Sequence, residues 1–217
     1  MAMTFYYLSG SPFSWKVWLA LERKQLAYDL RILSSDAGDL KTAEFVAINP
    51  RGKVPAIVDD GFVLYESAAI IEYLQDNYPQ SGQPLWPHAV RARALARRIA
   101  GEADSYIYPS VRKLVLELIA RREGQPDAAI IEEAKAALVG EFALLERSLL
   151  GPFVTGSDPS AADFAHYPLA AIIRRIEARQ PHYEVGDVLP DGIRKWMEQI
   201  GMLPYFAKTT PPHWRPQ

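Results

Sequence analysis

The 217-residue sequence predicts an α+β domain followed by an all-helical domain. Segments rich in β-branched and aromatic residues, typical of strands, are found only before about residue 80, where they alternate with helical segments. Beyond about residue 89 the apolar residues follow helical spacing. The stretch 79–84, rich in residues that break regular structure, lies between the two regions. We therefore predict a first domain over 1–79, a linker over 80–88 and a helical domain over 89–217.

Local start and stop signals define the elements of the first domain. Ser11 suits the N-cap of a helix, because its hydroxyl can accept a hydrogen bond from a free backbone N–H group. Pro12 suits the first helical position, because it has no N–H group that would need a partner. Asn49-Pro50 ends a second helix, since the α region is disfavoured before proline. Asp59-Asp60-Gly61 indicates a hairpin. The expected elements are strands at 4–8, 28–33, 56–58 and 62–64, and helices from 12, over 40–47 and from Glu66-Ser67 to about Tyr78.

The helical domain is expected to contain four long helices. Glycine and proline at 124–126 and 151–152 mark breaks between them. Ser160, with Asp163 three residues later, matches a capping box, in which the two side chains satisfy free N–H groups reciprocally. We interpret this pair as structural, because losing such a cap typically costs ~1 kcal/mol of stability. The expected helices span about 89–122, 127–149, 160–179 and 190–200.

Composition argues against several classes of function. The net charge is −2 with a pI near 6.1 and no long run of one sign, so neither nucleic acid nor a membrane surface is expected as a partner. No apolar run reaches the ~20 residues of a spanning helix and no charged leader is seen, so a cytoplasmic location is expected. With no cysteine and four histidines without ligand spacing, no metal site is expected. Thiol chemistry would need a thiol supplied by a ligand.

Two linked motifs point to a site for a small anionic peptide. The first is Asn49-Pro50-Arg51-Gly52-Lys53-Val54-Pro55; after a short hairpin comes Glu66-Ser67-Ala68-Ala69-Ile70-Ile71-Glu72-Tyr73-Leu74. A strand that begins Val-Pro offers backbone hydrogen bonds, and Glu-Ser at a helix start offers a carboxylate, a hydroxyl and free amides. In order and spacing these motifs resemble those of the cytosolic glutathione transferases. The resemblance covers essentially the whole chain.

The resemblance implies a thioredoxin-like fold for the first domain, glutathione as co-substrate, and a homodimer. It also implies that the helical domain contributes to the site for a small electrophile. Serine-type members, which include theta-, phi- and zeta-like classes, carry a catalytic serine where this chain has Ser11. Leu40 stands where the phi class has a histidine, and Lys53 where it has a glutamine. The class is therefore open.

Ser11 is the candidate catalytic residue. A free thiol has a pKa of about 8.5, so only a few per cent of it is ionised at neutral pH. A hydroxyl donor and the positive end of a helix can lower that pKa. The segment 11–14, Ser-Pro-Phe-Ser, sits where glutaredoxin-like relatives carry Cys-Pro-x-Cys, which excludes a protein disulfide here. The competing interpretation is a helix cap only. Other hydroxyl groups could take this role. Two come from the nearby serines Ser9 and Ser14. Two come from Tyr6 and Tyr7, which lie near the position of the catalytic tyrosine in alpha-, mu- and pi-like members.

The resemblance assigns the remaining glutathione contacts. Val54 and Pro55 would pair with the cysteinyl backbone, and the family has this proline cis. Glu66 would bind the γ-glutamyl ammonium and Ser67 the α-carboxylate, although Glu-Ser could also serve only as a helix cap. The two lysines at positions that match contacts to the glycine carboxylate and the backbone are Lys41 and Lys53.

The electrophile pocket and a contact across the dimer are assigned in the same way. The side chains that could wall the pocket are Phe13, Trp15, Tyr106, Tyr108 and Arg112. Aromatic residues at helical spacing are also compatible with an ordinary core. Asp104 could reach the γ-glutamyl ammonium of a partner's ligand.

The expected function is attack by glutathione thiolate on a small hydrophobic electrophile, with Ser11 stabilising the thiolate. Two enzymatic alternatives use the same scaffold, a glutathione-dependent isomerase and a peroxidase. A non-enzymic glutathione-binding protein is a third, because a fold does not fix a function.

Overall fold

A computed structural model describes residues 3–214 of the chain. The contacts divide these residues into two compact units, one made of 3–86 with 204–214 and the other of 87–203. A boundary therefore falls within the predicted linker 80–88. The C-terminal residues differ from the prediction, which gave them to a helical domain over 89–217. Residues 204–214 belong to the first unit instead, because they pack on its first helix, α1 (Pro12–Arg23).

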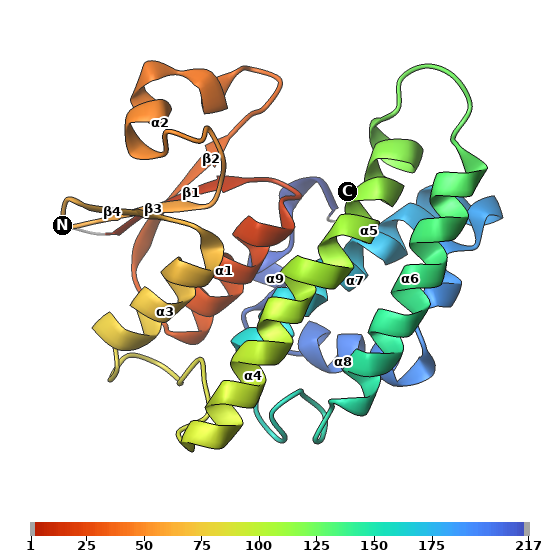
Figure 1. Ribbon diagram of the computed structural model, residues 1–217. Helices are drawn as coiled ribbons and strands as arrows, with labels where there is room; N and C mark the ends of the chain where they lie inside the picture. Colours follow the sequence, from red (N-terminus) through yellow and green to blue (C-terminus); the bar gives the residue numbers. More distant parts are fainter. Residues whose placement is uncertain (1–2, 215–217) are drawn as a thin grey trace. The chain divides into compact units, whose positions relative to one another are not determined.

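A four-stranded sheet forms the centre of the first unit (Figure 1). Its strands are β1 (Met3–Leu8), β2 (Tyr28–Leu33), β3 (Ala56–Asp59) and β4 (Phe62–Tyr65), in the spatial order β2-β1-β3-β4. β1 is parallel to β2 and antiparallel to β3, and β3 and β4 form a hairpin. Asp60 and Gly61 in its turn have φ values of 48° and 84°, the left-handed conformation that a two-residue hairpin loop requires. The predicted hairpin is confirmed.

Helices cover both faces of this sheet. Besides α1 they are α2 (Ala43–Ile48), α3 (Ser67–Asn77) and α9 (Phe206–Thr209). Side chains alternate along β1: Tyr7 packs on Trp18 of α1 with ring centroids 4.9 Å apart, and Tyr6 packs on Phe45 of α2 at 5.8 Å. α3 packs beside α1. The order β-α-β-α-β-β-α gives this unit the thioredoxin-like fold that the resemblance implied.

The helix predicted over 40–47 is divided in two. A 3-10 turn, Asp39–Lys41, precedes α2, and Thr42 lies between them in an extended conformation. The hydroxyl of Thr42 accepts a hydrogen bond from the N–H of Phe45 at 3.3 Å, so Thr42 caps α2. Apolar spacing alone misses this break, because it does not register a side chain that competes for the backbone.

The second unit is built from helices. They are α4 (Val90–Glu102), α5 (Tyr108–Val115), α6 (Ala128–Arg147), α7 (Ala161–Arg179) and α8 (Asp191–Gly201), with 3-10 turns at Pro181–Tyr183 and Val185–Val188. These elements agree with the four predicted helical segments. Within residues 3–214, no helix is both long and apolar enough to cross a membrane.

The helix predicted over 89–122 contains two π turns, Ala103–Ile107 and Leu116–Ala120. The first directly precedes the turn that holds Pro109. A proline in a helix lacks an N–H and its ring crowds the preceding turn. In the π turn the N–H of Tyr108 donates to the carbonyl of Ala103, one residue further back than in an α-helix. The wider turn accommodates the proline without ending the helix.

α7 is the buried centre of the second unit, and Asp163 anchors its start. The predicted capping box with Ser160 is confirmed. The carboxylate of Asp163 accepts hydrogen bonds from the N–H and the hydroxyl of Ser160 at 2.8 and 3.0 Å. It also accepts from the N–H of Val154 and the indole of Trp196 on α8, both at 2.9 Å. One buried side chain thus joins α7, α8 and the preceding loop.

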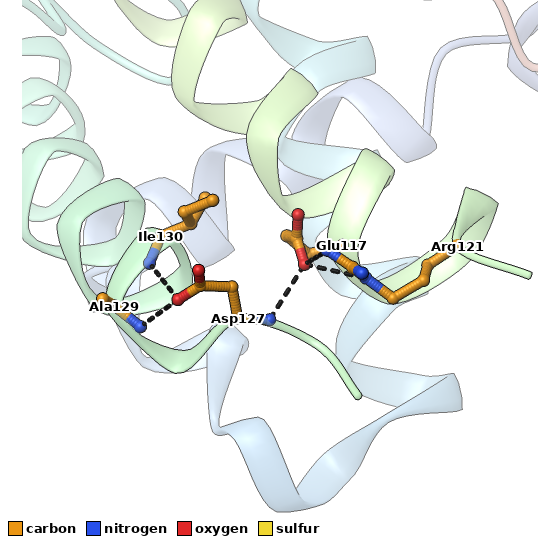
Figure 2. A network of polar contacts seen from close by, with 5 residues as sticks. All are labelled: Glu117, Arg121, Asp127, Ala129 and Ile130. Atoms are coloured by element: carbon orange, nitrogen blue, oxygen red, sulfur yellow. Dashed lines mark hydrogen bonds and ion pairs between the residues drawn. The ribbon is translucent and has the colours of Figure 1, made fainter. Parts of the chain in front are cut away.

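A second carboxylate fixes the connection into α6, as Figure 2 shows. Glu117 accepts a hydrogen bond from the N–H of Asp127 and another from the Nε of Arg121, both at 2.9 Å. The side chain of Asp127 caps α6 in turn. The N–H of Asp127, followed by the Arg121 guanidinium, holds the pKa of Glu117 below its ordinary value. These contacts therefore stabilise the fold at neutral pH and lose their effect as the pH falls through that lowered value.

We expect Asp163→Asn to destabilise the protein nearly as much as Asp163→Ala. Asparagine keeps one acceptor oxygen but turns an NH₂ group toward donors that need an acceptor. Each buried group left unsatisfied costs about 1–3 kcal/mol. Urea denaturation measures the loss, with Asp158→Asn on the exposed preceding loop as the control. A loss of less than about 1 kcal/mol for Asp163→Asn would contradict this reading of the four hydrogen bonds.

Candidate functional site

The register of the sheet brings the predicted site segments to one end of the first unit. Tyr6 pairs with Ala56 across β1 and β3, and Ala56 pairs with Tyr65 across β3 and β4. Continued by one or two residues, this antiparallel register sets Val54-Pro55 beside the end of β1 and Glu66 beside Pro55. The loop from β1 to α1 begins at that same end. The β1–α1 loop, the Val-Pro segment and the start of α3 are therefore neighbours.

Ser11 is the N-cap of α1, as predicted. Its hydroxyl oxygen accepts from the N–H of Ser14 at 3.2 Å, and its own N–H donates to the carbonyl of Leu8 at 3.0 Å. A serine hydroxyl has one donor and two acceptor lone pairs, so capping leaves its proton available to donate. The cap and a thiolate contact are compatible. The helix end itself offers fewer amides than the sequence suggested, because Pro12 has no N–H and that of Ser14 bonds Ser11.

The two tyrosines offered as alternatives to Ser11 lie on opposite faces of the sheet. Tyr7 is fully buried, with its ring against Trp18. Tyr6 faces a hollow of about 380 Å³ bounded by β1, β2 and α2, which is lined in part by Arg31 and Phe45. Burial keeps the Tyr7 hydroxyl from solvent, and the position of Tyr6 under α2 turns it away from α1.

The two alternative serines differ in exposure. Ser14 lies fully buried in the first turn of α1. Ser9 is partly exposed in the same loop as Ser11, and its hydroxyl is hydrogen-bonded to Nδ1 of His213 at 2.6 Å. Among these two, Ser9 alone shares the setting of Ser11.

Asn49 organises the loop that leads to the Val-Pro segment. Its buried side chain donates to the carbonyl of Lys53 at 2.6 Å and accepts from the N–H of Arg51 at 3.0 Å. Gly52 has a φ of 58°, and a Cβ at this position would lie 2.9 Å from the carbonyl oxygen of Leu40. Only glycine fits such a contact without displacement. The motif thus fixes a loop, which ends at a cis peptide bond between Val54 and Pro55, as the resemblance implied.

Glu66 is held in an unusual backbone conformation at the start of α3. Its φ of 71° and ψ of 111° lie in a region that residues other than glycine rarely adopt. Such a conformation costs about 1–3 kcal/mol. The side chain is 68% exposed, and its carboxylate lies 3.9 Å from Nε of Arg51. Ser67 follows as a buried first residue of the helix. Strain of this kind is typical of residues that a ligand site holds in place.

Lys41 and Lys53 are both exposed, at the end of the 3-10 turn and in the Asn49 loop. Their segments meet at the contact between Gly52 and the Leu40 carbonyl, because Leu40 precedes Lys41 and Gly52 precedes Lys53. Their side chains therefore start from adjacent backbone positions on one edge of the first unit.

The residues proposed for the electrophile pocket are divided between the units. In the first, Phe13 is partly exposed and its ring lies 5.2 Å from Nζ of Lys16, whereas Trp15 is buried. In the second, the π turn Ala103–Ile107 holds Asp104, which is partly exposed, and Tyr106, which is exposed. Next along that helix are Tyr108, partly exposed, and Arg112, exposed.

Two site features were not predicted. Arg51 and His213 were not proposed as site residues, although Arg51 lies within the quoted motif. Its position next to Glu66 could have been inferred from the hairpin that folds β3 onto β4. For the segment 211–216, which contains His213, the sequence left open whether it folds over the pocket or frays, and it singled out no side chain there. Among residues 3–214, no group of three or more His, Cys, Asp or Glu side chains could hold a metal ion.

Known proteins resemble this chain in sequence and in fold. A sequence model described as "Glutathione S-transferase, N-terminal domain" matches residues 10–77, which include both motifs. Glutathione S-transferase 3 of Zea mays is 30% identical over 207 residues, covering 94% of this chain and 91% of that protein. A probable maleylacetoacetate isomerase of Caenorhabditis elegans is 36% identical over 163 residues, covering 73% of each protein.

A solved structure agrees with the sequence relatives. The crystal structure of a glutathione S-transferase from the Antarctic clam Laternula elliptica is 30% identical, with a TM-score of 0.81 over 99% of this chain and 94% of that one. Sequence and fold thus agree along nearly the whole length. The chain belongs to the glutathione S-transferase family of enzymes.

Proposed function

We propose that this glutathione transferase binds glutathione at the end of the sheet where β1, β3 and β4 meet and activates its sulfur as a thiolate through Ser11. The observation that carries the proposal is the strand register, which makes the Ser11 loop, Val54-Pro55 and Glu66-Ser67 neighbours within one unit. The thiol loses its proton to solvent, and the sulfur lone pair then forms a bond to an electrophilic carbon. A leaving group on that carbon departs with the bonding pair.

One hydrogen bond from Ser11 is enough to make this step useful at neutral pH. A hydrogen bond to a charged group contributes about 1.5–3 kcal/mol, and each unit of pKa corresponds to about 1.4 kcal/mol. Because the hydroxyl proton favours the ionised sulfur, it lowers the thiol pKa by roughly one to two units on this basis. Ionisation then rises from a few per cent to a substantial fraction. The remaining catalytic effect is orientation of the bound thiolate.

The start of α3 would hold the amino-acid head of glutathione. Glu66 offers a carboxylate for its ammonium group, and Ser67 offers a hydroxyl and an amide at a helix start for its carboxylate. Nε of Arg51 lies 3.9 Å from this carboxylate, in an ion pair between two exposed side chains. Val54 would pair through its backbone with the cysteinyl residue. Lys41 and Lys53 are proposed for the glycine end.

The second substrate is proposed to be a small hydrophobic electrophile. In the first unit, Phe13 is proposed to contact it, because this partly exposed ring lies two residues after Ser11. A glutathione-dependent isomerase is the second candidate, supported by the 36% identity to a protein named as a probable maleylacetoacetate isomerase. Product analysis distinguishes the two, because a transferase consumes glutathione in step with the electrophile and an isomerase returns it.

We also propose a homodimer that works in the cytoplasm, where thiols are kept reduced. Leu95 on α4 and Leu150 are 56% and 77% exposed, and both line a hollow of about 340 Å³ together with Ile99. Exposed apolar side chains grouped in this way are typical of interfaces. Asp104, further along the same helix, is proposed to reach the γ-glutamyl ammonium group of the partner's ligand.

Ser11→Ala should raise the pKa of bound glutathione by about one to two units, because it removes a donor that favours the thiolate. Affinity well below that pKa should change little. The measurement is thiolate absorbance of the complex against pH. Ser11→Thr, which keeps a cap and a hydroxyl, and Tyr7→Phe are the comparisons. If Ser11→Ala titrates like the wild type, Ser11 is only a helix cap.

Glu66→Gln should weaken glutathione binding, because an ammonium–carboxylate contact becomes a neutral hydrogen bond. Truncating one member of such a pair costs about 2–5 kcal/mol, and this milder change belongs at or below the lower end. Calorimetry gives the dissociation constant, with Glu72→Gln on the same helix as the control. When Ser67→Ala is combined with Glu66→Gln, the loss of binding free energy should be smaller than the sum of the two separate losses, because both residues are proposed to hold the γ-glutamyl head of glutathione. An unchanged constant for Glu66→Gln would remove Glu66 from the site.

Leu95→Asp should shift the protein from dimer to monomer, because a charge cannot be buried in an apolar interface without a partner. Light scattering coupled to size-exclusion chromatography gives the mass. Val139→Asp, at an exposed apolar position on α6, is the matched control. A wild-type protein that is monomeric at micromolar concentration would exclude the dimer, and a dimeric Leu95→Asp variant would exclude this surface.

A further inference from the structure

Residues 204–214, here called the C-terminal strap, return to the first unit after the helical unit is complete. One anchor is an ion pair at 2.6 Å between Nζ of Lys208 and Oε1 of Glu22, whose side chain is only 11% exposed. The hydroxyl of Tyr28 donates to the same carboxylate, and Lys208 lies over the Tyr28 ring at 5.3 Å. Burial and the Glu22 carboxylate raise the pKa of Tyr28, so its hydroxyl stays a donor. The strap is therefore fixed to the end of α1 and to β2.

A second anchor is Trp15, in the first turns of α1. Its indole N–H donates to the hydroxyl of Thr209 at 3.3 Å. Its ring lies 6.1 Å from that of Phe206 and 5.3 Å from that of Trp214, the latter edge to face. Trp15 is buried, and these contacts explain why. The strap thus runs along α1 toward the start of that helix, where Ser11 lies.

The strap ends on the loop that precedes Ser11. Nδ1 of His213 is 2.6 Å from the hydroxyl of Ser9. Gly10 has a φ of 86°, and a Cβ at Gly10 would lie 3.2 Å from Cε1 of His213 and 3.9 Å from Nε1 of Trp214. The imidazole therefore covers the turn Ser9-Gly10 directly. The N–H of Ser11, the next residue, donates to the carbonyl of Leu8 and closes this turn.

The hydrogen bonds of His213 define which ring nitrogen carries the proton. The indole N–H of Trp214 can only donate, and it lies 2.8 Å from Nε2 of His213. Nε2 must therefore accept and carries no proton. The neutral ring has its proton on Nδ1, which donates to the hydroxyl oxygen of Ser9. That hydroxyl keeps its own proton to donate elsewhere. His213 thus holds Ser9 as a hydrogen-bond donor. Its Nε2 already accepts a hydrogen bond from the indole of Trp214, so His213 does not serve as the base for the thiol.

We propose that His213 is a positioning residue of the thiol site: it fixes the Ser9-Gly10 turn and, through that turn, the hydroxyl of Ser11. The proposal rests on the function of Ser11 proposed above. Glycine has the most conformational freedom of any residue, so an external contact at Gly10 helps this turn to hold one conformation. The contact comes from the C-terminal end of the described chain, 204 residues from Ser9 in the sequence. His213 is exposed, so its replacement leaves the core intact.

The first test is the titration of bound glutathione in His213 variants. His213→Ala should raise the pH of half-ionisation by about half to one unit, a part of the roughly one to two units assigned to Ser11, because a less restrained turn leaves the Ser11 hydroxyl aligned for only part of the time. His213→Asn, which keeps a donor near the position of Nδ1, should recover at least half of that shift. At neutral pH kcat should fall with the ionised fraction, while KM for glutathione stays within about twofold. His88→Asn, at an exposed histidine of the second unit, is the control and should titrate like the wild type.

The second test is a double-mutant cycle with Ser9. If His213 acts through Ser9, then Ser9→Ala should shift the titration in the wild-type background and add little in the His213→Ala background. Equal effects in both backgrounds would overturn the proposed route. An unchanged titration for His213→Ala would overturn the proposal as a whole.

The third test reads the tautomer without any turnover. Nitrogen NMR of labelled protein should show a neutral His213 protonated at Nδ1, and Trp214→Phe, which keeps an aromatic ring but removes the N–H donor, should weaken that preference. A ring protonated at Nε2 would overturn the assignment. Failure of the proposed function looks different: wild-type glutathione would ionise as it does in free solution, and Ser11→Ala would have no effect. A lowered wild-type pKa that depends on Ser11 but not on His213 would reject the inference alone.

Discussion

The antiparallel pairing of β3 with both β1 and β4 is the constraint on which the site depends. β3 has only four residues, so its register relative to each neighbour decides which loops meet at its ends. A slip of one residue would turn every side chain of β3 to the other face of the sheet. The left-handed conformation of Asp60 and Gly61 fixes the hairpin, and the neighbouring residues Ala56 and Ile57 are buried on opposite faces of the sheet. The register therefore fixes the position of Val54-Pro55 beside the end of β1.

Ser11 caps α1, and this role is compatible with the thiolate contact proposed for it. The cap uses one lone pair of the hydroxyl oxygen and leaves the hydroxyl proton to donate. The rest of the site consists mainly of backbone that is held in place: Asn49 holds a loop from both sides, and Glu66 has a φ that its neighbours impose. Preorganisation of this kind would favour binding at the proposed site, because a ligand would find its partners already oriented.

Sequence reasoning found the parts of this site that depend on local chemistry. A serine before a proline, a hairpin turn and a Glu-Ser pair at a helix start are all visible as short patterns, and each appears in the structure where it was expected. What depends on tertiary contacts stayed hidden. The φ of Glu66, the close approach of Gly52 to Leu40 and the division of a helix at Thr42 come from competition between neighbours that spacing does not encode. His213 lies too far along the chain for any pattern to pair it with Ser9.

The packing of Trp15 against the C-terminal strap has a consequence for how the protein is made. A ribosome releases the sheet and α1 early, but the side chains that cover this indole, Phe206, Thr209 and Trp214, are synthesised only after the whole helical unit. Until then the nascent first unit carries an uncovered aromatic surface of the kind that chaperones recognise. A chain that stalled before residue 204 would keep that surface permanently.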